Sequence, residues 1–468
     1  MRDAHTITYP DAVRRIAASV RDAGGRAFVV GGCIRDLLLG LPPGDADFEV
    51  YGLPLEKLLQ NLASIGRTEL VGKSFGVLKV TVEGHSYDVA IPRTERKTAP
   101  GHRGFDTSVA PDLEPATACR RRDLTVNALM HDPLTGELFD HVGGLRDLEF
   151  GVLRHISPAF GEDPLRALRV AQLAARLRFA VAPETIEMAR HLDLSELPRE
   201  RLFGEFQKLL LLATAPSWGL EVLRLVGGLR IFPELEALID CPQEPRFHPE
   251  GDVWTHTRLC LDRAAPLRRS SPKPLELMLA VLCHDLGKPL TTVRREDRLT
   301  SYRHEAEGEQ STRRFLDRLT TERDFIERVT GLVRHHLAPV FLYERRDEVK
   351  DGTIRRLAAR LDLHQLVLVA MADHGGRCQP DDGFPAGSWL LERATALSVT
   401  QGPPRPVLQG RHLLELGLAP GPHIGRIIRY VYEHQLDGTV QTLSEALELV
   451  RAQLARNPLW PDAESPES

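Results

Sequence analysis

Several features that would assign the chain to a special class of protein are missing from its 468 residues. The six cysteines are scattered without a C-x-x-C pair, which argues against a disulfide scaffold and favours a reducing compartment, the cytoplasm. No apolar run reaches the ~18–20 residues that a membrane span requires, and residues 1–5 lack the apolar core of a signal peptide. The net charge of −5 excludes a globally basic nucleic-acid binder but allows a local basic groove. We therefore expect a cytoplasmic protein with no membrane partner.

The composition that remains is that of an ordinary globular protein. Hydrophobic residues make up 42% and charged residues 27% of the chain. The length is enough for roughly three domains with a sizeable core.

A glycine pair near the N-terminus follows a predicted strand and precedes a predicted helix. The apolar run 27–30 indicates a buried strand. Gly31 and Gly32 allow a tight turn and a close approach of the backbone to a phosphate, beside a helix N-terminus that favours anions. Asp45 and Asp47 then begin the next predicted strand, where residues two apart share a face. An isolated Asp-x-Asp is usually a polar turn, but the Gly-Gly-x-x-Arg-Asp upstream favours a site for two Mg²⁺ ions ~3.5–4 Å apart.

This stretch resembles the head of class II nucleotidyltransferases of the polymerase-beta superfamily. Within that class it is similar to the bacterial tRNA nucleotidyltransferases, or CCA-adding enzymes, and to their poly(A) polymerase relatives. The resemblance implies an α/β head with a mixed sheet and helices. It also implies a third carboxylate that assists proton removal from the attacking hydroxyl, for which Asp88 on the predicted strand 86–90 is the candidate. Some members have no acid here, and a solvated strand residue is the alternative interpretation of Asp88.

An arginine-rich motif at 120–129 matches the Arg-Arg-Asp motif of the same family. Arginine forks suit a triphosphate, and a carboxylate suits a ribose hydroxyl. A basic cluster is usually a solvated face, but this one runs directly into apolar residues. The resemblance implies that the nucleotide is held by Gly31, Gly32, Arg35, Arg121, Arg122, Asp123, Asn127 and Arg169.

A third motif, Glu-Asp-Pro-Leu-Arg at 162–166, predicts the start of a helix. Asp163 and Arg166 are three residues apart and would share a helix face. One acceptor and one donor can pair with the amino group and ring nitrogen of cytosine or adenine, whereas uracil and guanine reverse that pattern. The family uses this motif as a protein template for CTP and ATP, and simple helix capping is the alternative. Relatives often carry a further arginine where this chain has Gln172, so one phosphate contact is expected to be missing.

A second group of metal-type side chains follows a proline-rich boundary near 242–245. Histidine and carboxylate on apolar helices suit a transition metal or Mg²⁺, and buried polar groups there need partners. The order of these residues resembles the HD phosphohydrolase superfamily. The candidate ligands are His256, His284, Asp285 and Asp373, with His304, His335 and His336 as less secure members.

Together these motifs predict four domains: a head at 1–155, a helical neck for base selection and RNA binding at 156–245, an HD domain at 246–380 and a helical tail at 381–468. The predicted function is template-independent transfer of CMP and AMP from CTP and ATP to the 3′ end of tRNA, with Mg²⁺ in the head and a divalent metal of unknown identity in the HD domain. An enzyme that adds only A, or a poly(A) polymerase, remains open. Two further alternatives are an HD phosphohydrolase with an RNA-binding head and a non-catalytic RNA-binding module.

Overall fold

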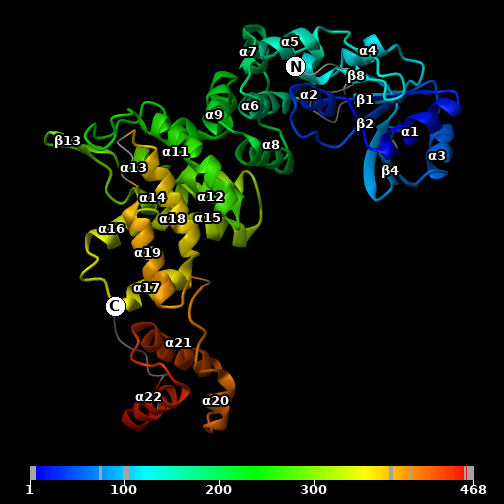
Figure 1. Cartoon of the computed structure of the whole chain (residues 1–468). Helices are drawn as coiled ribbons and strands as arrows, with labels where there is room; N and C mark the ends of the chain where they lie inside the picture. The colour runs from blue at the N-terminus through cyan, green and yellow to red at the C-terminus, as the bar shows by residue number, and fades with distance from the viewer. Residues whose placement is uncertain are drawn as a thin grey trace. The chain divides into compact units, whose positions relative to one another are not determined.

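The structure, a computed structural model, describes residues 7–72, 76–97, 105–378, 383–400, 402–457 and 460. The chain divides into two compact units, Met1–Pro233 and Glu234–Ser468 (Figure 1). Across the described ranges, no helix is both long enough and apolar enough to cross a bilayer. The finer division into four domains stays a prediction.

The first unit is built around a mixed sheet of seven strands in the order β3-β4-β5-β2-β1-β8-β9. Strand β2 pairs with β5 in parallel, and the other neighbours are antiparallel. Helices α1 (Asp11–Asp22), α2 (Gly32–Leu39) and α3 (Leu55–Ala63) belong to the same region. The strands are β1 (Arg26–Val30), β2 (Asp47–Tyr51), β3 (Arg67–Gly72), β4 (Val77–Val82), β5 (His85–Ala90), β8 (Met130–His131) and β9 (Leu138–Phe139). A separate hairpin joins β6 (Arg93–Lys97) and β7 (Phe105–Val109).

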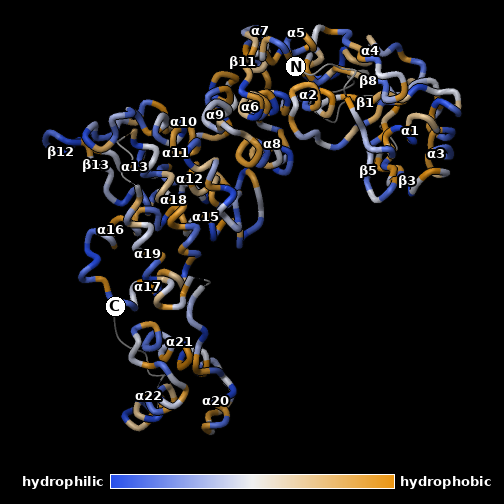
Figure 2. The backbone as a smooth tube through the Cα atoms, viewed as in Figure 1, coloured by the Kyte–Doolittle hydropathy of each residue, from blue (hydrophilic) through white to orange (hydrophobic). Residues whose placement is uncertain are grey.

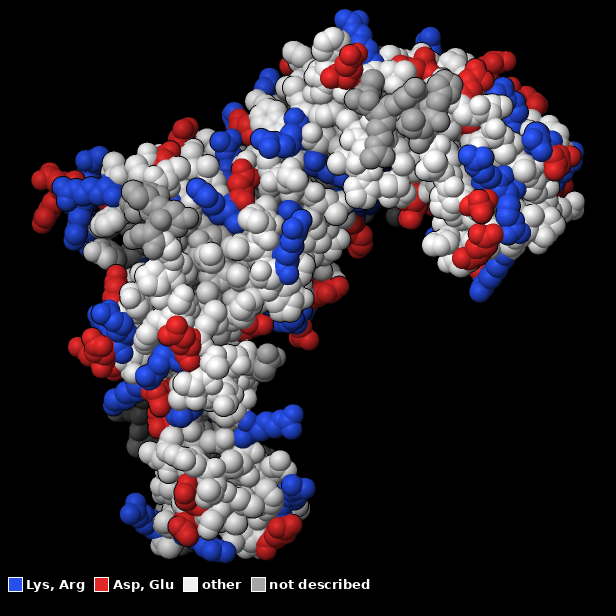
Figure 3. Space-filling model, in the orientation of Figure 1, with Lys and Arg blue, Asp and Glu red and all other residues white. Residues whose placement is uncertain are grey.

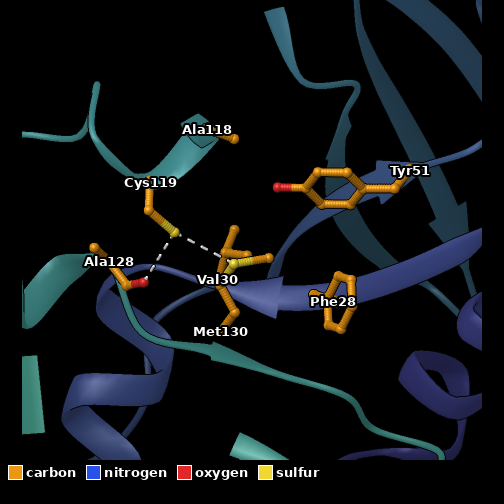
Figure 4. Packing of buried hydrophobic residues seen from close by; sticks show 7 residues of the cluster. All are labelled: Phe28, Val30, Tyr51, Ala118, Cys119, Ala128 and Met130. Atoms are coloured by element: carbon orange, nitrogen blue, oxygen red, sulfur yellow. Dashed lines mark hydrogen bonds between the residues drawn. The ribbon is translucent and has the colours of Figure 1, made fainter. Parts of the chain in front are cut away.

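Strand β1 is buried along four of its five residues, as its apolar run predicts. Its side chains enter a core cluster that Figure 4 shows around Phe28 and Val30. The Cys119 thiol at the end of α4 (Pro115–Cys119) lies 3.5 Å from the backbone oxygen of Ala128. This packing fixes Val30, the last residue of β1, and thereby the turn that follows it.

Helices continue the first unit beyond the sheet. Helix α6 (Arg166–Leu177) packs against α8 (Arg199–Leu212) and α9 (Pro216–Leu225). Its alanines are buried together with Leu168, Val170 and Leu173. The remaining elements here are α5 (Gly144–Phe150), β10 (Val152–Leu153), β11 (Ala180–Val181) and α7 (Pro183–Arg190).

The second unit is helical, as predicted, with one added hairpin of β12 (Val293–Arg295) and β13 (Arg298–Thr300). Helix α12 (Pro274–Cys283) is buried from Glu276 to its end and is strongly apolar (Figure 2), so α11 (Val253–Leu267), α15 (Arg323–His335) and α18 (Leu363–Gly375) pack around it. The other helices up to the tail are α13 (Lys288–Thr291), α14 (His304–Asp317), α16 (Ala338–Glu344), α17 (Asp351–Arg360) and α19 (Pro385–Ala396). The tail helices α20 (Gly410–Glu415), α21 (Pro422–Asp437) and α22 (Leu443–Arg456) share a small core of their own.

Candidate functional site

Two of the three head carboxylates lie side by side on the central strands. Asp47 opens β2 opposite Val30. In the parallel pairing of β2 with β5, Phe48 lies beside Val89, and both are buried. Asp47 and Asp88 precede these two residues, so their side chains share the opposite, exposed face of the sheet.

Asp45 lies in the exposed connection before β2, and not on the strand as predicted. The reason is that β1 ends at Val30 and turns away, so no partner strand extends the pairing beyond Asp47. Asp45 is still close enough to raise the pKa of Asp47. The three carboxylates thus form one acidic group.

The acidic group carries charge that a cation would neutralise. Desolvation by the surrounding protein, followed by the nearby Asp88 carboxylate, raises the pKa of Asp47 to about 6, although the Asp47 side chain itself is exposed. The Arg122 guanidinium acts in the opposite direction and donates to Glu49, two residues further along β2, at 3.1 Å. Crowded carboxylates beside an arginine suit divalent metal and a polyphosphate.

The glycine turn has the predicted form. Gly31 has a φ of +82°, which is the left-handed region that favours glycine. A Cβ at Gly32 would lie 3.2 Å from Nη2 of Arg35, so the turn is closely packed. Helix α2 begins at Gly32 and offers its first backbone N–H groups to an anion.

Arg35 is only 3% exposed and is committed to protein partners. It donates to Asp36 at 2.8 and 2.9 Å and to the Asn127 side chain. The second oxygen of Asp36 accepts from Arg176 at 2.8 Å. These contacts favour a positioning role for Arg35, and its predicted contact with phosphate stays a prediction.

Asp123 and Asn127 form a connected network with Arg169. Arg169 pairs with Asp123 at 2.7 Å, and Asn127 donates to the other oxygen of Asp123 at 3.1 Å. The pKa of Asp123 is lowered despite burial, because Arg169 and these hydrogen bonds stabilise the carboxylate. Gln172, one turn further along α6, is buried, and the loss of one phosphate contact expected at this position stays a prediction.

The predicted base-selecting pair, Asp163 and Arg166, does not lie on one helix face as expected. Helix α6 begins at Arg166, so Asp163 lies in extended backbone before the helix and does not share a helix face. The cause is Pro164, which biases the residue before it away from the helical region. Asp163 accepts two hydrogen bonds from Arg201 of α8, at 2.7 and 3.2 Å. Sequence analysis missed Arg201, which lies 38 residues away.

Arg166 is fixed by two backbone carbonyls. Its guanidinium donates to Ala159 O at 2.6 Å and to Arg121 O at 2.9 Å. Arg121 in turn donates to Arg93 O at 3.0 Å. Several segments therefore hold Asp163 and Arg166 in place, and their role as the acceptor and donor that read the base stays a prediction.

A separate metal-type cluster lies in the second unit, and it unites the four predicted HD residues. The Nε2 atom of His256 lies 3.0 Å from Asp373 Oδ1 and 3.7 Å from Asp285 Oδ2. The Nε2 atom of His284 lies 3.2 Å from Asp285 Oδ2 and 3.9 Å from Asp373 Oδ1. All four residues are buried.

Two further histidines extend the cluster on the other side of Asp285. His304 Nε2 lies 3.4 Å from Asp285 Oδ1 and also 3.4 Å from His336 Nε2. His335 is not among the grouped ligand atoms, whereas its neighbour His336 is. Asp285 thus lies between two sets of ligands.

The histidine tautomers fit metal binding. The Nδ1 atoms of His284, His304 and His336 lie 2.7–2.8 Å from backbone carbonyl oxygens, which accept only from a protonated nitrogen. Burial and the neighbouring histidines lower the pKa of His336 to about 3, so its ring is neutral. The Nε2 atom of His336 therefore carries a lone pair, and it lies 3.4 Å from His304 Nε2, an arrangement that a cation between the two rings would stabilise.

Sequence analysis missed the residues that orient these ligands. Glu250 lies 2.7 Å from His256 Nδ1, and Lys288 and Arg377 pair with Asp285 at 2.7 Å and with Asp373 at 2.9 Å. The spacing offered a signal for two of them, since Lys288 is three residues after Asp285 and Arg377 four after Asp373. A cavity of about 340 Å³ opens onto Asp285, His304, His336 and Asp373.

Comparison with known families gives two matches. Residues 27–154 match the poly A polymerase head domain, and residues 253–374 match the HD domain. These segments contain the carboxylates of the head and the histidine cluster, respectively.

Similar proteins are known along most of the chain. The multifunctional CCA protein of Methylococcus capsulatus is 39% identical over 423 residues, which cover 86% of this chain and 92% of that protein. The protein of the same description from Xylella fastidiosa is 38% identical over 391 residues, covering 80% of this chain and 90% of that protein.

Solved structures share the fold at low identity. The Bacillus stearothermophilus CCA-adding enzyme in complex with CTP has a TM-score of 0.59 at 19% identity, with 98% of this chain and 100% of that chain covered. The Thermotoga maritima CCA-adding enzyme complexed with tRNA has a TM-score of 0.58 at 19% identity, with 96% and 97% covered. The predicted fold class, a mixed α/β head followed by helical regions, is confirmed.

Proposed function

Since this chain belongs to the family of multifunctional CCA proteins, we propose that it adds CMP and AMP from CTP and ATP to the 3′ end of tRNA without a nucleic-acid template. The single observation that supports this most strongly is the acidic group of Asp45, Asp47 and Asp88 beside the glycine turn, within the segment that matches the head domain. Relatives named for CCA favour this product over a terminal A alone or poly(A). A cytoplasmic location, expected from the cysteines, stays a prediction.

In the proposed reaction, the 3′-hydroxyl of tRNA attacks the α-phosphorus of the nucleotide. The bond to the β-phosphate oxygen breaks, and pyrophosphate leaves. Asp45 and Asp47 would hold the divalent metal, which we propose to be Mg²⁺, and Asp88 would assist removal of the hydroxyl proton. The metal would polarise the attacking oxygen and stabilise the leaving one.

The remaining head residues bind and select the nucleotide. The backbone of Gly31 and Gly32 and the α2 N-terminus would contact phosphate, together with Arg121, Arg122 and Arg169. Asp123 and Asn127 are already hydrogen-bonded to one another, which supports a role in shaping the ribose and phosphate site. Arg201 would keep Asp163 in position opposite the base.

The second unit carries a separate proposed activity. The HD cluster would hold a divalent metal through His256, His284, Asp285 and Asp373, with His304 and His336 on the other side of Asp285. Such a centre activates water toward a phosphoester. The substrate class we propose is a 2′,3′-cyclic phosphate, in which water adds to phosphorus and the proton passes to the ribose oxygen that leaves.

The experiment that tests the transfer site compares Asp45→Ala and Asp47→Ala with Asp112→Ala, an exposed aspartate of the same region. We expect nucleotide addition to fall to less than a few per cent in the first two variants and to persist in the third. Binding of tRNA, measured by filter retention, should survive in all three because phosphate contacts elsewhere hold the RNA. If the chain only binds RNA, its tRNA binding should not depend on Mg²⁺ or nucleotide and no addition should be measured. Substantial nucleotide addition by the Asp47→Ala protein would show that the reaction does not take place at this acidic group.

A further inference from the structure

Two large aromatic side chains stand exposed at the cavity of the HD cluster. Phe247 is 62% and Tyr302 is 60% exposed, and both line the cavity of about 340 Å³ that reaches the metal-type residues. We call this pair the aromatic rim. Both rings keep more than half of their surface in solvent, so the rim provides apolar, π-faced surface at this cavity.

The rim comes from two segments that are separated in the sequence. Phe247 lies in the turn between α10 (Pro233–Glu236) and α11, where its backbone N–H donates to Glu244 O at 3.0 Å. Tyr302 lies between β13 and α14, and the Arg295 guanidinium is 5.3 Å from its ring centroid. Glu244 also accepts from the Leu299 backbone at 3.0 Å, which ties the two segments together.

The rest of the cavity lining is mixed, and it includes three cationic side chains beside the carboxylates of the cluster. Lys288, Arg298 and Arg377 line it together with the ligand residues. Lys288 and Arg377 pair with the carboxylates of the cluster, whereas Arg298 is exposed at the start of β13. Basic side chains gather over this hairpin in Figure 3, at the left edge of the view, with acidic ones beside them. A ligand with a negative phosphate at the metal and a flat aromatic group at the entrance matches this lining.

We propose that the aromatic rim of Phe247 and Tyr302 stacks on a nucleobase and makes the HD cavity selective for nucleoside phosphoesters over phosphoesters without a base. This inference rests on the proposed phosphohydrolase activity and names the group that its substrate carries. The nucleobase would stack on the rim while the phosphoester reaches the cluster around Asp285. Base–aromatic stacking tolerates any of the four bases because each has a π-face.

The test measures kcat/KM of the full chain, loaded with Ni²⁺, Mn²⁺ or Mg²⁺ in separate series. The two substrates are adenosine 2′,3′-cyclic phosphate and glycerol 1,2-cyclic phosphate, which present the same cyclic ester with and without a base. The variants are Phe247→Ala and Tyr302→Ala, with Phe247→Tyr and Tyr302→Phe as conservative changes. Phe341→Ala is the matched control, since Phe341 is 56% exposed in the same unit and is not among the residues lining this cavity.

We expect each alanine variant to lose about 5- to 150-fold in kcat/KM for the adenosine ester, mainly through KM, and less than twofold for the glycerol ester. The conservative variants and the control should keep the wild-type preference. An equal loss on both substrates would mean that the rim acts through the fold or the metal. No loss on either would mean that the base does not contact it, and both results would overturn the inference.

Failure of the proposed hydrolysis can be told apart from failure of the rim. If the wild-type chain hydrolyses neither ester with any metal, the phosphohydrolase proposal is wrong. Calorimetric titration with adenosine 3′-phosphate then decides the rim. A binding step that is lost in Phe247→Ala and Tyr302→Ala but kept in Phe341→Ala would support it, and identical titrations in all proteins would overturn it.

Discussion

Replacing Arg166 with alanine should relax base selection more than it weakens nucleotide binding. In the structure, the Arg166 guanidinium is fixed by Ala159 O and Arg121 O, and the Asp163 carboxylate is fixed by Arg201. The alanine variant removes the donor while leaving the acceptor in place. Cytosine and adenine then lose one pairing contact, whereas uracil and guanine lose one repulsive contact between two donors.

The expected size follows from the number of contacts that change. A bidentate pair between a side chain and a base edge discriminates by about 1–3 kcal/mol, which is roughly 5- to 150-fold. Only one of the two contacts is lost, so we expect the ratio of kcat/KM for CTP over UTP to fall by about tenfold. The ratio for ATP over GTP should fall similarly, because the same two positions read both bases.

The assay extends tRNA that lacks part of its 3′ end with each of the four nucleotides. Arg199→Ala is the matched control, since Arg199 is an exposed arginine on α8 close in sequence to Arg201. The control should keep wild-type selectivity. A variant of Arg166 that stays fully selective but slows with all four nucleotides would refute the template role and leave Arg166 as a link between its two carbonyl partners.

Two further predictions concern the metal sites. With Asp285→Ala, phosphoester hydrolysis should be lost while nucleotide addition continues, because Asp285 lies between both sets of HD ligands and the head carboxylates belong to the other unit. Parallel assays of the two activities check this prediction. Loss of both activities would show that the two sites depend on each other. With limiting Mg²⁺, nucleotide addition should decline as the pH falls through about 6, because the raised pKa of Asp47 leaves its carboxyl protonated below that value. Saturating Mg²⁺ should shift the decline to lower pH, since metal and proton compete for the same oxygens. A flat pH profile between pH 5 and 7 at limiting Mg²⁺ would contradict the role of Asp47 as a metal ligand.

Local patterns were sufficient to predict the elements that carry the head site. The apolar run before Gly31 is the buried strand β1, and the glycine pair occupies the turn into α2. The strand face that Asp47 shares with Asp88 could not be predicted from the local pattern. Alternation along one strand suggested Asp45 as the companion of Asp47, and Asp88 was named only through the family resemblance, whereas the pairing between β2 and β5 places Asp88 beside Asp47. Strand pairing is a long-range property that a local pattern does not contain.

The same limit explains what was missed around the other residues. Arg201 reaches Asp163 from another helix, and Glu250 reaches His256 from the turn before α11. The helix predicted to open within 162–166 begins at Arg166, but the helix face expected to be shared by Asp163 and Arg166 was wrong, because Pro164 biases Asp163 toward extended backbone. In the HD cluster, the order of histidines and aspartates predicted the four main residues, but only the fold distinguishes His336 from its neighbour His335.

The measurement that tests the central proposal most directly is addition of single labelled nucleotides to tRNAs that lack CCA, lack CA or lack only the terminal A. The proposed function predicts that CTP alone adds two residues to the tRNA that lacks CCA, one residue to the tRNA that lacks CA, and none to the tRNA that lacks only the terminal A. It predicts that ATP alone extends the tRNA lacking only the terminal A by one residue, and that UTP and GTP are not used. Incorporation of A without any incorporation of C, or growth of a tail of many A residues, would contradict the proposal and point to a terminal-A or poly(A) enzyme.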